Sequence, residues 1–284
     1  MWIFEVKRSS QKSRDPMQAS FFTNYSIDDD THALVREAIQ NSLDARSKKE
    51  THQPVRVRFF VGTHDAGSKI MDSYISDEAW KHFNAFDNGL KSPPTRADDC
   101  KFLVYEDFHT SGLIGNESAT EPEKGNSFYY FMRAEGQSGK DEGERGRHGI
   151  GKYVFPYTSR IRMYFAATVR ESDSRCLIAG QSVLKSHSVD GVKYTPDGWW
   201  GTKLDCGIDD YLQLPIEEES NWLRLKQDFS LNRERTQSGL SLIIPYINDD
   251  VDVAKLGEHA VKEFFLPILH NQLIVNIQSE NIDF

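Results

Sequence analysis

The sequence from residue 31 to residue 50, THALVREAIQNSLDARSKKE, has the hydrophobic periodicity of a helix. Val35, Ile39 and Leu43 fall on one side at about 100° per residue, and neither Gly nor Pro interrupts the segment. The acidic run SIDDD just before it supplies side chains that cap a helix N-terminus. The pattern therefore predicts an amphipathic helix over about 31–50.

Shorter segments have the β-branched and aromatic composition of strands and are mixed with further helical patterns. Strands are predicted at 55–62, 101–107, 159–170, 174–187, 239–247 and 273–278. Shorter helices are predicted around 76–83, 221–229 and 252–265. The mixed order of these elements indicates an α/β protein, and no repeat of solenoid length is present.

Between Ser111 and Gly151 the composition changes, because glycines lie among many charged residues and only FYYFMR at 128–133 interrupts them. These glycines are Gly112, Gly115, Gly125, Gly136, Gly139, Gly143, Gly146, Gly149 and Gly151. A segment of this kind is typical of a long mobile loop.

The composition is that of a globular protein, with 284 residues of which 38% are hydrophobic and 27% charged. The net charge of −9 disfavours nonspecific binding to nucleic acid, so we expect such contacts only through other domains. Cys100, Cys176 and Cys206 are far apart, which supports neither a disulfide framework nor a structural zinc site. No signal-peptide core and no apolar run of about 18 residues is present, so we expect a cytoplasmic protein without a membrane partner.

We expect residues 1–24 to form an N-terminal arm and residues 25–284 to form one domain. The strand-like LIVNIQ at 273–278 is followed closely by the last residue, Phe284, without a polar terminator. This indicates the N-terminal part of a longer polypeptide.

The polar side of the first predicted helix carries two carboxylates and an amide. Glu37, Asn41 and Asp44 fall within about 60° of one another, opposite the hydrophobic stripe. The ordinary interpretation is a solvated face, which every amphipathic helix has. The small residues Ser42 and Ala45 beside these oxygen ligands favour a second interpretation, in which a ligand approaches the helix closely.

REAIQNSLDA at 36–45 resembles the N-box of the GHKL ATPases, whose pattern is Glu-x-x-x-Asn-x-x-Asp-Ala. The resemblance implies that Glu37 is the general base that activates the attacking water and that Asn41 is a Mg²⁺ ligand. It also places Asp44 among the nucleotide-binding residues. Mg²⁺ prefers oxygen donors and keeps several waters, so one amide oxygen and the phosphates of the nucleotide suffice.

The second box of the family, Asp-x-Gly-x-Gly at the end of a strand, is similar to EDFHTSGLIG at 106–115. The resemblance implies that Asp107 accepts a hydrogen bond from the adenine amino group and that Gly112 belongs to the site. His109 and Ser111 stand where the family has glycine, so we expect a differently built turn. Read without the N-box, Asp107 is equally an ordinary turn aspartate.

The third box is a glycine-rich segment that closes over the phosphates, and RGRHGIGKYVF at 145–155 resembles it. Glycines let backbone N–H groups approach an anion. The resemblance implies nucleotide contacts for Gly146, Gly149, Ile150, Gly151 and Lys152. The same string also fits the P-loop form Gly-x-x-x-x-Gly-Lys, but Tyr153 replaces the Ser or Thr that binds Mg²⁺ there, and DEGER precedes it instead of a buried strand.

The fourth feature of the family, Gly-Thr at the start of a late strand, corresponds to SGLSLIIPY at 238–246. Leu240 stands where threonine is usual, so Ser241 is the candidate hydroxyl donor. WGTKL at 200–204 contains a literal Gly-Thr and is the alternative. We favour 239–241 because its strand character and its place near the end of the domain suit the pattern better.

Together the motifs imply a Bergerat fold, an α+β two-layer sandwich with a mixed β-sheet, helices on one face and an ATP lid at about 111–149. They imply slow Mg²⁺-dependent ATP hydrolysis and an ATP-dependent homodimer, with residues 1–24 as the arm that reaches the partner. The combination is most similar to the MORC-related and bacterial MORC-like ATPases. Such domains drive a downstream domain or effector protein in DNA transactions or phage defence.

Three alternatives remain open at this point. A nucleotide-sensing module binds ATP with little or no turnover; the departures from the family pattern at His109 and Leu240 favour it, whereas Glu37 argues for turnover. A histidine kinase catalytic domain predicts a phosphoacceptor helix, which is not visible. A scaffold that binds no nucleotide leaves the polar stripe and the glycine-rich segment without a role.

Overall fold

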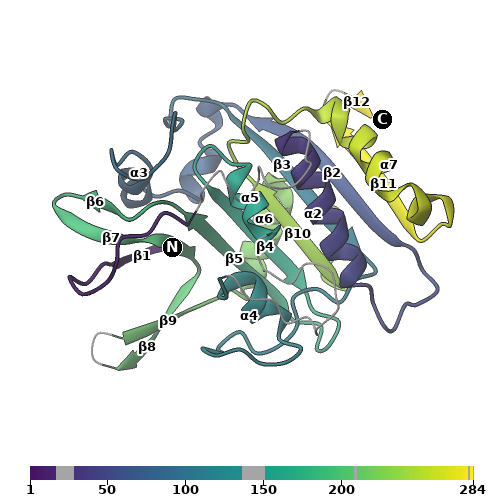
Figure 1. Cartoon of the computed structure of the whole chain (residues 1–284), viewed down its shortest axis with the longest axis horizontal. Coiled ribbons are helices and arrows are strands. Elements are labelled where there is room, and N and C mark those ends of the chain that lie inside the picture. Colours follow the sequence, from purple (N-terminus) through teal and green to yellow (C-terminus); the bar gives the residue numbers. More distant parts are fainter. Residues whose placement is uncertain (17–28, 136–150, 208–209, 281, 284) are drawn as a thin grey trace.

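The computed structural model describes residues 1–16, 29–135, 151–207, 210–280 and 282–283. Its main feature is a 10-stranded sheet in the order β1-β7-β5-β4-β10-β3-β2-β11-β12, with β6 attached to β7 (Figure 1). These strands are β1 (Trp2–Val6), β2 (Val55–His64), β3 (Cys100–Phe108), β4 (Met163–Val169), β5 (Cys176–Val183), β6 (His187–Val189), β7 (Val192–Trp200), β10 (Gly239–Ile244), β11 (Leu273–Ser279) and β12 (Ile282–Asp283). Among the strand pairs of the described residues only β2 and β11 are parallel, so the sheet is mixed.

A second, two-stranded sheet is formed by β8 (Thr202–Gly207) and β9 (Asp210–Leu214), a hairpin that projects from the main sheet (Figure 1). The side chains of β8 are exposed along its whole length. The sequence pattern did not predict the strands between His187 and Leu214, because most of their side chains lie outside a core and lack a clear hydrophobic alternation.

Helices cover both faces of the main sheet. They are α2 (Asp30–Asp44), α3 (Asp77–Phe83), α4 (Ser127–Met132), α5 (Val154–Tyr157), α6 (Glu219–Asp228) and α7 (Val253–Leu269), with 3-10 turns η1 (Ala66–Ser68), η2 (Ile70–Ser73) and η3 (Gly151–Tyr153). One core joins the sheet to α2, α4, α5 and α7, and a second core joins the opposite face to α3, α6 and η2.

The mixed α/β class is therefore confirmed, but the predicted restriction of helices to one face is not. Successive side chains of a strand point to opposite faces, and both sets are apolar in β3. Leu103 and Tyr105 belong to the first core, whereas Phe102 and Val104 belong to the second. Because both faces of the sheet are apolar, helices must cover it on both sides.

The predicted helix at 31–50 is confirmed as α2 but ends at Asp44, six residues early. Asp29 caps its start by accepting from His32 N, and Val35 and Ile39 are fully buried as the stripe predicts. The helix ends at Asp44 because the backbone groups that follow it form hydrogen bonds with the segment after β3. Ser111 N donates to Ala45 O at 2.8 Å, and Ser47 N donates to the backbone oxygen of His109 at 2.9 Å.

The described part of the predicted lid, residues 111–135, is not a loose loop. It contains α4, whose start is capped by the Asn126 side chain accepting from Tyr129 N. Phe128 and Met132 of α4 are buried in the first core. The apolar residues of FYYFMR thus anchor this half of the glycine-rich segment to the sheet, and residues 136–149 of the predicted lid lie outside the described part.

The described part of the predicted N-terminal arm is attached to this domain itself. β1 pairs in antiparallel fashion with β7, with Trp2 opposite Trp200, and the Met1 ammonium donates to Gly201 O at 3.0 Å. Trp2 and Phe4 pack against the second core. Residues 1–6 therefore extend the sheet, and residues 17–24 of the arm lie outside the described residues.

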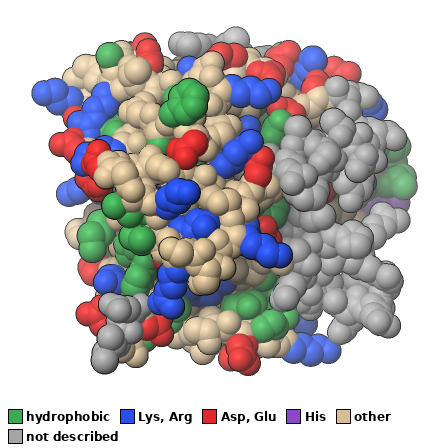
Figure 2. Space-filling model, turned by 60° about the vertical axis from the view of Figure 1, so that its left-hand side comes forward, with side chains coloured by type: hydrophobic (Ala, Val, Ile, Leu, Met, Phe, Trp, Pro, Cys, Tyr) green, Lys and Arg blue, Asp and Glu red, His purple; other side chains and the backbone are tan. Residues whose placement is uncertain are grey.

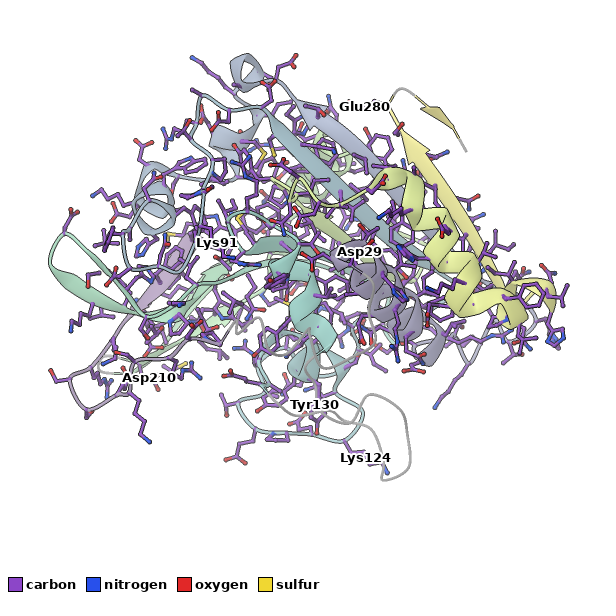
Figure 3. The ribbon with its side chains drawn as sticks, turned by 45° about the horizontal axis from the view of Figure 1, so that its top comes forward. Asp29, Lys91, Lys124, Tyr130, Asp210 and Glu280 are labelled. Carbon is purple, nitrogen blue, oxygen red and sulfur yellow. The ribbon has the colours of Figure 1, made fainter. Side chains whose placement is uncertain are left out.

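At 17 residues, α7 is the longest helix that the structure describes. It lies along α2, where His32 Nε2 is 2.8 Å from Glu263 Oε1 and Lys255 Nζ is 3.1 Å from Asp29 Oδ2 (Figure 3). Within the described ranges no helix combines the length and the apolar character needed to cross a bilayer.

Candidate functional site

Helix α2 brings together three segments that are far apart in the sequence. Ser42 Oγ donates to Asp107 Oδ2 at 2.8 Å, which joins the helix to the end of β3. Five residues earlier on the same helix, the Glu37 carboxylate lies against Gly151. The three sequence motifs around Glu37, Asp107 and Gly151 thus meet at one place.

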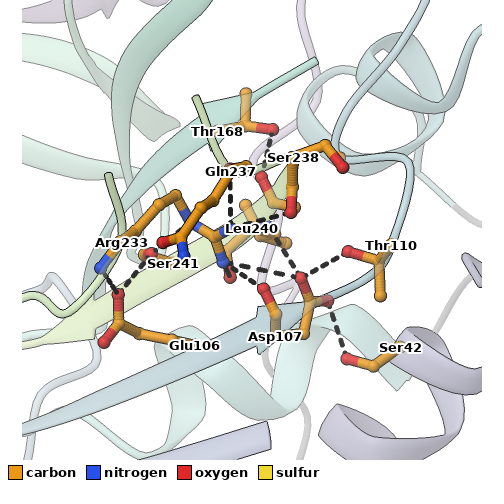
Figure 4. A network of polar contacts seen from close by, with 12 residues as sticks. Ser42, Glu106, Asp107, Thr110, Thr168, Arg233, Gln237, Ser238, Leu240 and Ser241 are labelled. Atoms are coloured by element: carbon orange, nitrogen blue, oxygen red, sulfur yellow. Dashed lines mark hydrogen bonds and ion pairs between the residues drawn. The ribbon is translucent and has the colours of Figure 1, made fainter. Parts of the chain in front are cut away.

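The Asp107 carboxylate is buried, with 4% of the residue exposed, and is bonded at both oxygens (Figure 4). Oδ1 accepts from Thr110 Oγ1 at 2.7 Å and from Leu240 N at 2.7 Å. Oδ2 accepts from Ser42 Oγ. Because a carboxylate offers about four acceptor positions, these bonds leave Oδ2 with capacity for one more donor.

Tyr105, two residues before Asp107 on β3, holds Ser42 in place. Its hydroxyl lies 2.6 Å from Ser42 Oγ and 3.0 Å from Ala38 O. Burial raises the pKa of Tyr105 well above its usual value, so the phenol stays neutral and donates. The Ser42 proton is then available to Asp107.

Glu37 and Gly151 are in direct contact. A Cβ atom at Gly151 would stand 1.9 Å from Glu37 Oε2, closer than any side chain tolerates. Gly151 begins η3, which follows the glycine-rich segment and leads into α5. The absence of a side chain at 151 therefore creates the space in which the predicted general base sits.

Asn41 and Asp44 lie one turn and two turns after Glu37 on α2. Both backbones are helical, Asn41 is partly exposed and Asp44 is exposed. Gln40 Nε2 donates to Asp44 Oδ1 at 3.0 Å. Within the described ranges no group of three or more His, Cys, Asp or Glu residues could hold a metal ion. A Mg²⁺ ion would therefore be held here through the Asn41 amide oxygen together with a ligand that brings its own oxygens.

The side chain of Lys152 points to the C-terminal end of α4. Its Nζ donates to Tyr130 O at 2.7 Å, to Phe131 O at 3.1 Å and to Ala134 O. These carbonyls are at the C-terminal end of the helix, where a cation is favourable. Burial lowers the pKa of Lys152 to about 8, against the opposing effect of Glu135 and Asp197. A phosphate contact by Lys152 requires the ammonium group to leave these carbonyls.

The segment around Gly239 lies beside Asp107, whereas Gly201 and Thr202 of the alternative lie at the base of the β8–β9 hairpin. A Cβ atom at Gly239 would stand 2.4 Å from Asp107 O. The Ser241 hydroxyl, however, does not bond Asp107. It faces the other side of the sheet, donates to Glu106 Oε1 at 2.9 Å and accepts from Arg233 Nε at 2.9 Å.

The turn after β3 has the backbone of a glycine turn although it lacks the expected glycine. His109 has a φ of 61°, in the left-handed region, and its Nδ1 is 2.7 Å from Pro54 O. Gly112 has a φ of 66°, and a Cβ atom there would stand 2.4 Å from Val169 O. Gly112 is therefore needed for packing against the ends of β4 and β10.

Gly146, Gly149 and Ile150 lie outside the described residues. Of the predicted site residues that are described, Glu37 and Asn41 lie on α2, and Asp107 and Gly151 contact this helix. Lys152 is held at α4, and Ser241 is on the opposite face.

The sequence pattern missed most of the groups that hold Asp107. Thr110 and Tyr105 are close to it in sequence, but nothing in their spacing distinguishes them from ordinary strand and turn residues. Arg233 lies in the polar segment NRERTQS, which indicates an exposed loop, and it is fully buried. Only the strand order, with β10 beside β3, brings it here.

No family model matches the chain, and a search of curated proteins finds no match. Two similar solved structures are of the ATPase region of Saccharomyces cerevisiae topoisomerase II. The one bound to ICRF-187 (dexrazoxane) has 10% sequence identity and a TM-score of 0.37, covering 89% of this chain and 48% of that chain. The other has 9% identity and a TM-score of 0.33, covering 88% and 48%.

The chain thus spans about half the length of these two structures.

On the general-base role that the sequence resemblance implies for Glu37, we expect Gly151→Ala to reduce ATP turnover by about 10²-fold, because the new methyl group displaces the Glu37 carboxylate. The fold should persist, since the displaced atoms are the end of a flexible side chain. Steady-state phosphate release and thermal unfolding measure the two effects. Gly67→Ala, which meets nothing within 4 Å, is the matched control. Unchanged turnover in Gly151→Ala would contradict this role of the contact.

At position 109 we expect the Gly variant to be more stable than the Ala variant. Both lose the hydrogen bond to Pro54 O, but only alanine keeps the cost of the left-handed backbone, about 1 kcal/mol. Urea unfolding of His109→Gly and His109→Ala measures the difference. Equal stabilities would show that the turn relaxes out of this conformation.

Proposed function

We propose that the chain is an ATP-binding domain of the GHKL type that hydrolyses ATP slowly with Mg²⁺. The observation that supports this most strongly is the convergence on α2 of Glu37, the buried Asp107 and Gly151 at the end of the glycine-rich segment. These three motifs follow the order of the GHKL boxes, and Ser42 and Asp107 are 65 positions apart. A chance match of one short motif does not account for their meeting in space.

In this proposal the residues have separate tasks. Asp107 accepts from the adenine amino group through the remaining capacity of Oδ2. Glu37 takes a proton from the attacking water, and its position beside Gly151 holds it where the glycine-rich segment ends. Asn41 would hold Mg²⁺, which would neutralise charge on the phosphates when bound.

The wider role follows from the sequence resemblance. We propose that ATP binding gates dimerisation of a larger protein, and that any contact with nucleic acid is made by other domains. Figure 2 shows one face of the molecule, on which Lys and Arg side chains are interspersed with Asp and Glu rather than forming a wholly basic surface. Membership of the MORC-related branch and a role in DNA transactions or phage defence stay predictions from the motifs.

The function is tested by comparing Glu37→Gln and Asn41→Ala with the wild type. We expect Glu37→Gln to bind a fluorescent ATP analogue like the wild type but to lose turnover by roughly 10²- to 10⁴-fold, because the general base is gone. Asn41→Ala should lose Mg²⁺-dependent binding. Glu50→Gln, which removes the same charge at an exposed position, serves as the control.

The outcomes separate the candidate functions. A wild type that binds no ATP analogue contradicts the proposal. Binding without turnover in the wild type supports the nucleotide-sensing alternative instead, and equal turnover in wild type and Glu37→Gln assigns hydrolysis to another residue or to a contaminant.

Dimerisation is tested by sedimentation velocity with and without a nonhydrolysable ATP analogue. We expect the analogue to convert monomer to dimer in the wild type and not in Asn41→Ala, because a nucleotide shifts an equilibrium only through its differential affinity for the two states. A monomer at all analogue concentrations would contradict nucleotide gating within this domain.

A further inference from the structure

Arg233 lies behind the candidate adenine site, on the side of Asp107 away from α2, and is completely buried. Its Nη2 donates to Asp107 O and, at 2.8 Å, to Leu240 O. Its Nη1 donates to the carbonyls of Gln237 and Ser238 at 3.1 and 3.0 Å. One guanidinium thus ties the end of β3 to the start of β10 (Figure 4).

This arrangement also holds Leu240, whose N–H orients the Asp107 side chain. Leu240 donates its N–H to Asp107 Oδ1 while its own carbonyl is held by Arg233. The guanidinium also lies 3.7 Å from Asp107 Oδ1 and supplies the opposite charge that a buried carboxylate needs. Arg233 therefore acts on Asp107 through the backbone, through Leu240 and through its charge.

A second buried arginine provides a natural comparison. Glu106 accepts from Ser241 Oγ and Arg233 N through Oε1, and from Asn232 N and Arg58 Nη1 through Oε2. Arg58 donates in addition to Gln278 Oε1 at 2.7 Å and to Ser230 O at 3.0 Å. Both arginines thus belong to one buried network around Glu106, but only Arg233 bonds the backbone of Asp107.

The chemistry of the purine bases gives this difference a consequence. Adenine presents an amino group, a donor, where guanine presents O6, an acceptor. A carboxylate only accepts hydrogen bonds and so selects adenine. This selection requires the carboxylate oxygens of Asp107 to stay where the amino group of the base can reach them.

We propose that Arg233 is a positioning residue that sets the preference of this site for adenine over guanine nucleotides, by holding Asp107 in place as an acceptor. The inference rests on the proposed ATP-binding function and assigns a specificity role to a residue that touches no nucleotide. Its counterpart Arg58 stabilises the same network without that role.

The test uses two double variants that leave the buried network with balanced charge. Arg233→Met with Glu106→Gln keeps Arg58 and Asp107, whereas Arg58→Met with Glu106→Gln keeps Arg233 and Asp107. Removing one positive and one negative group together avoids leaving a bare buried charge, which is the costly case. Circular dichroism and thermal unfolding confirm that each protein is folded at the temperature of measurement.

The readout is the ratio of the dissociation constants for GTP and ATP, measured by displacement of a fluorescent ATP analogue. We expect the Arg233 double variant to lower this ratio by roughly tenfold or more, mainly through weaker ATP binding. The Arg58 double variant should keep the wild-type ratio, whatever its thermal stability. Arg233→Lys keeps the charge but not the fork of donors, so we expect its ratio to lie between those of the wild type and the Arg233 double variant.

A wild-type ratio of the two dissociation constants in the folded Arg233 double variant would overturn the inference. An equal fall of this ratio in both double variants would overturn it too. If the wild type binds neither nucleotide, the proposed function itself fails. An ATP preference in the wild type that survives loss of Arg233 contradicts only the role given to Arg233.

Discussion

The buried carboxylate of Asp107 is the constraint around which the rest of the site is arranged. A buried charge is costly unless it is paired and hydrogen-bonded. Here the compensation comes from α2 through Ser42, from the turn after β3 through Thr110, and from β10 through Leu240 N. Because each partner belongs to a different element, satisfying this one group fixes the helix, the turn and the strand relative to one another.

Helix α2 connects this polar centre to the hydrophobic core. Val35 and Ile39 are fully buried against the sheet, so the helix cannot slide without opening that core. On its other side Glu37 meets the backbone at Gly151. A single rigid helix therefore transmits the position of the sheet to the end of the glycine-rich segment.

Much of this arrangement could be predicted from sequence, and the remainder could not for identifiable reasons. The helix and the central strands follow from local patterns of hydrophobic and β-branched residues, whereas the grouping of Glu37, Asp107 and Gly151 could be expected only from the resemblance of their motifs to the GHKL boxes. The direction of Ser241 depends on its register opposite Glu106 in a neighbouring strand that is distant in sequence. Burial of Arg233 and the attachment of β1 to β7 depend in the same way on which strands become neighbours.

The contacts of Lys152 have a consequence for how the glycine-rich segment can change in evolution. Since its ammonium group binds carbonyls at the end of α4, including that of Ala134, the chain returns near residue 152 to the place it left near residue 134. The cost of closing a loop grows only slowly with its length once the ends are fixed together. Insertions and deletions between these two anchor points should therefore leave the sheet and α2 undisturbed.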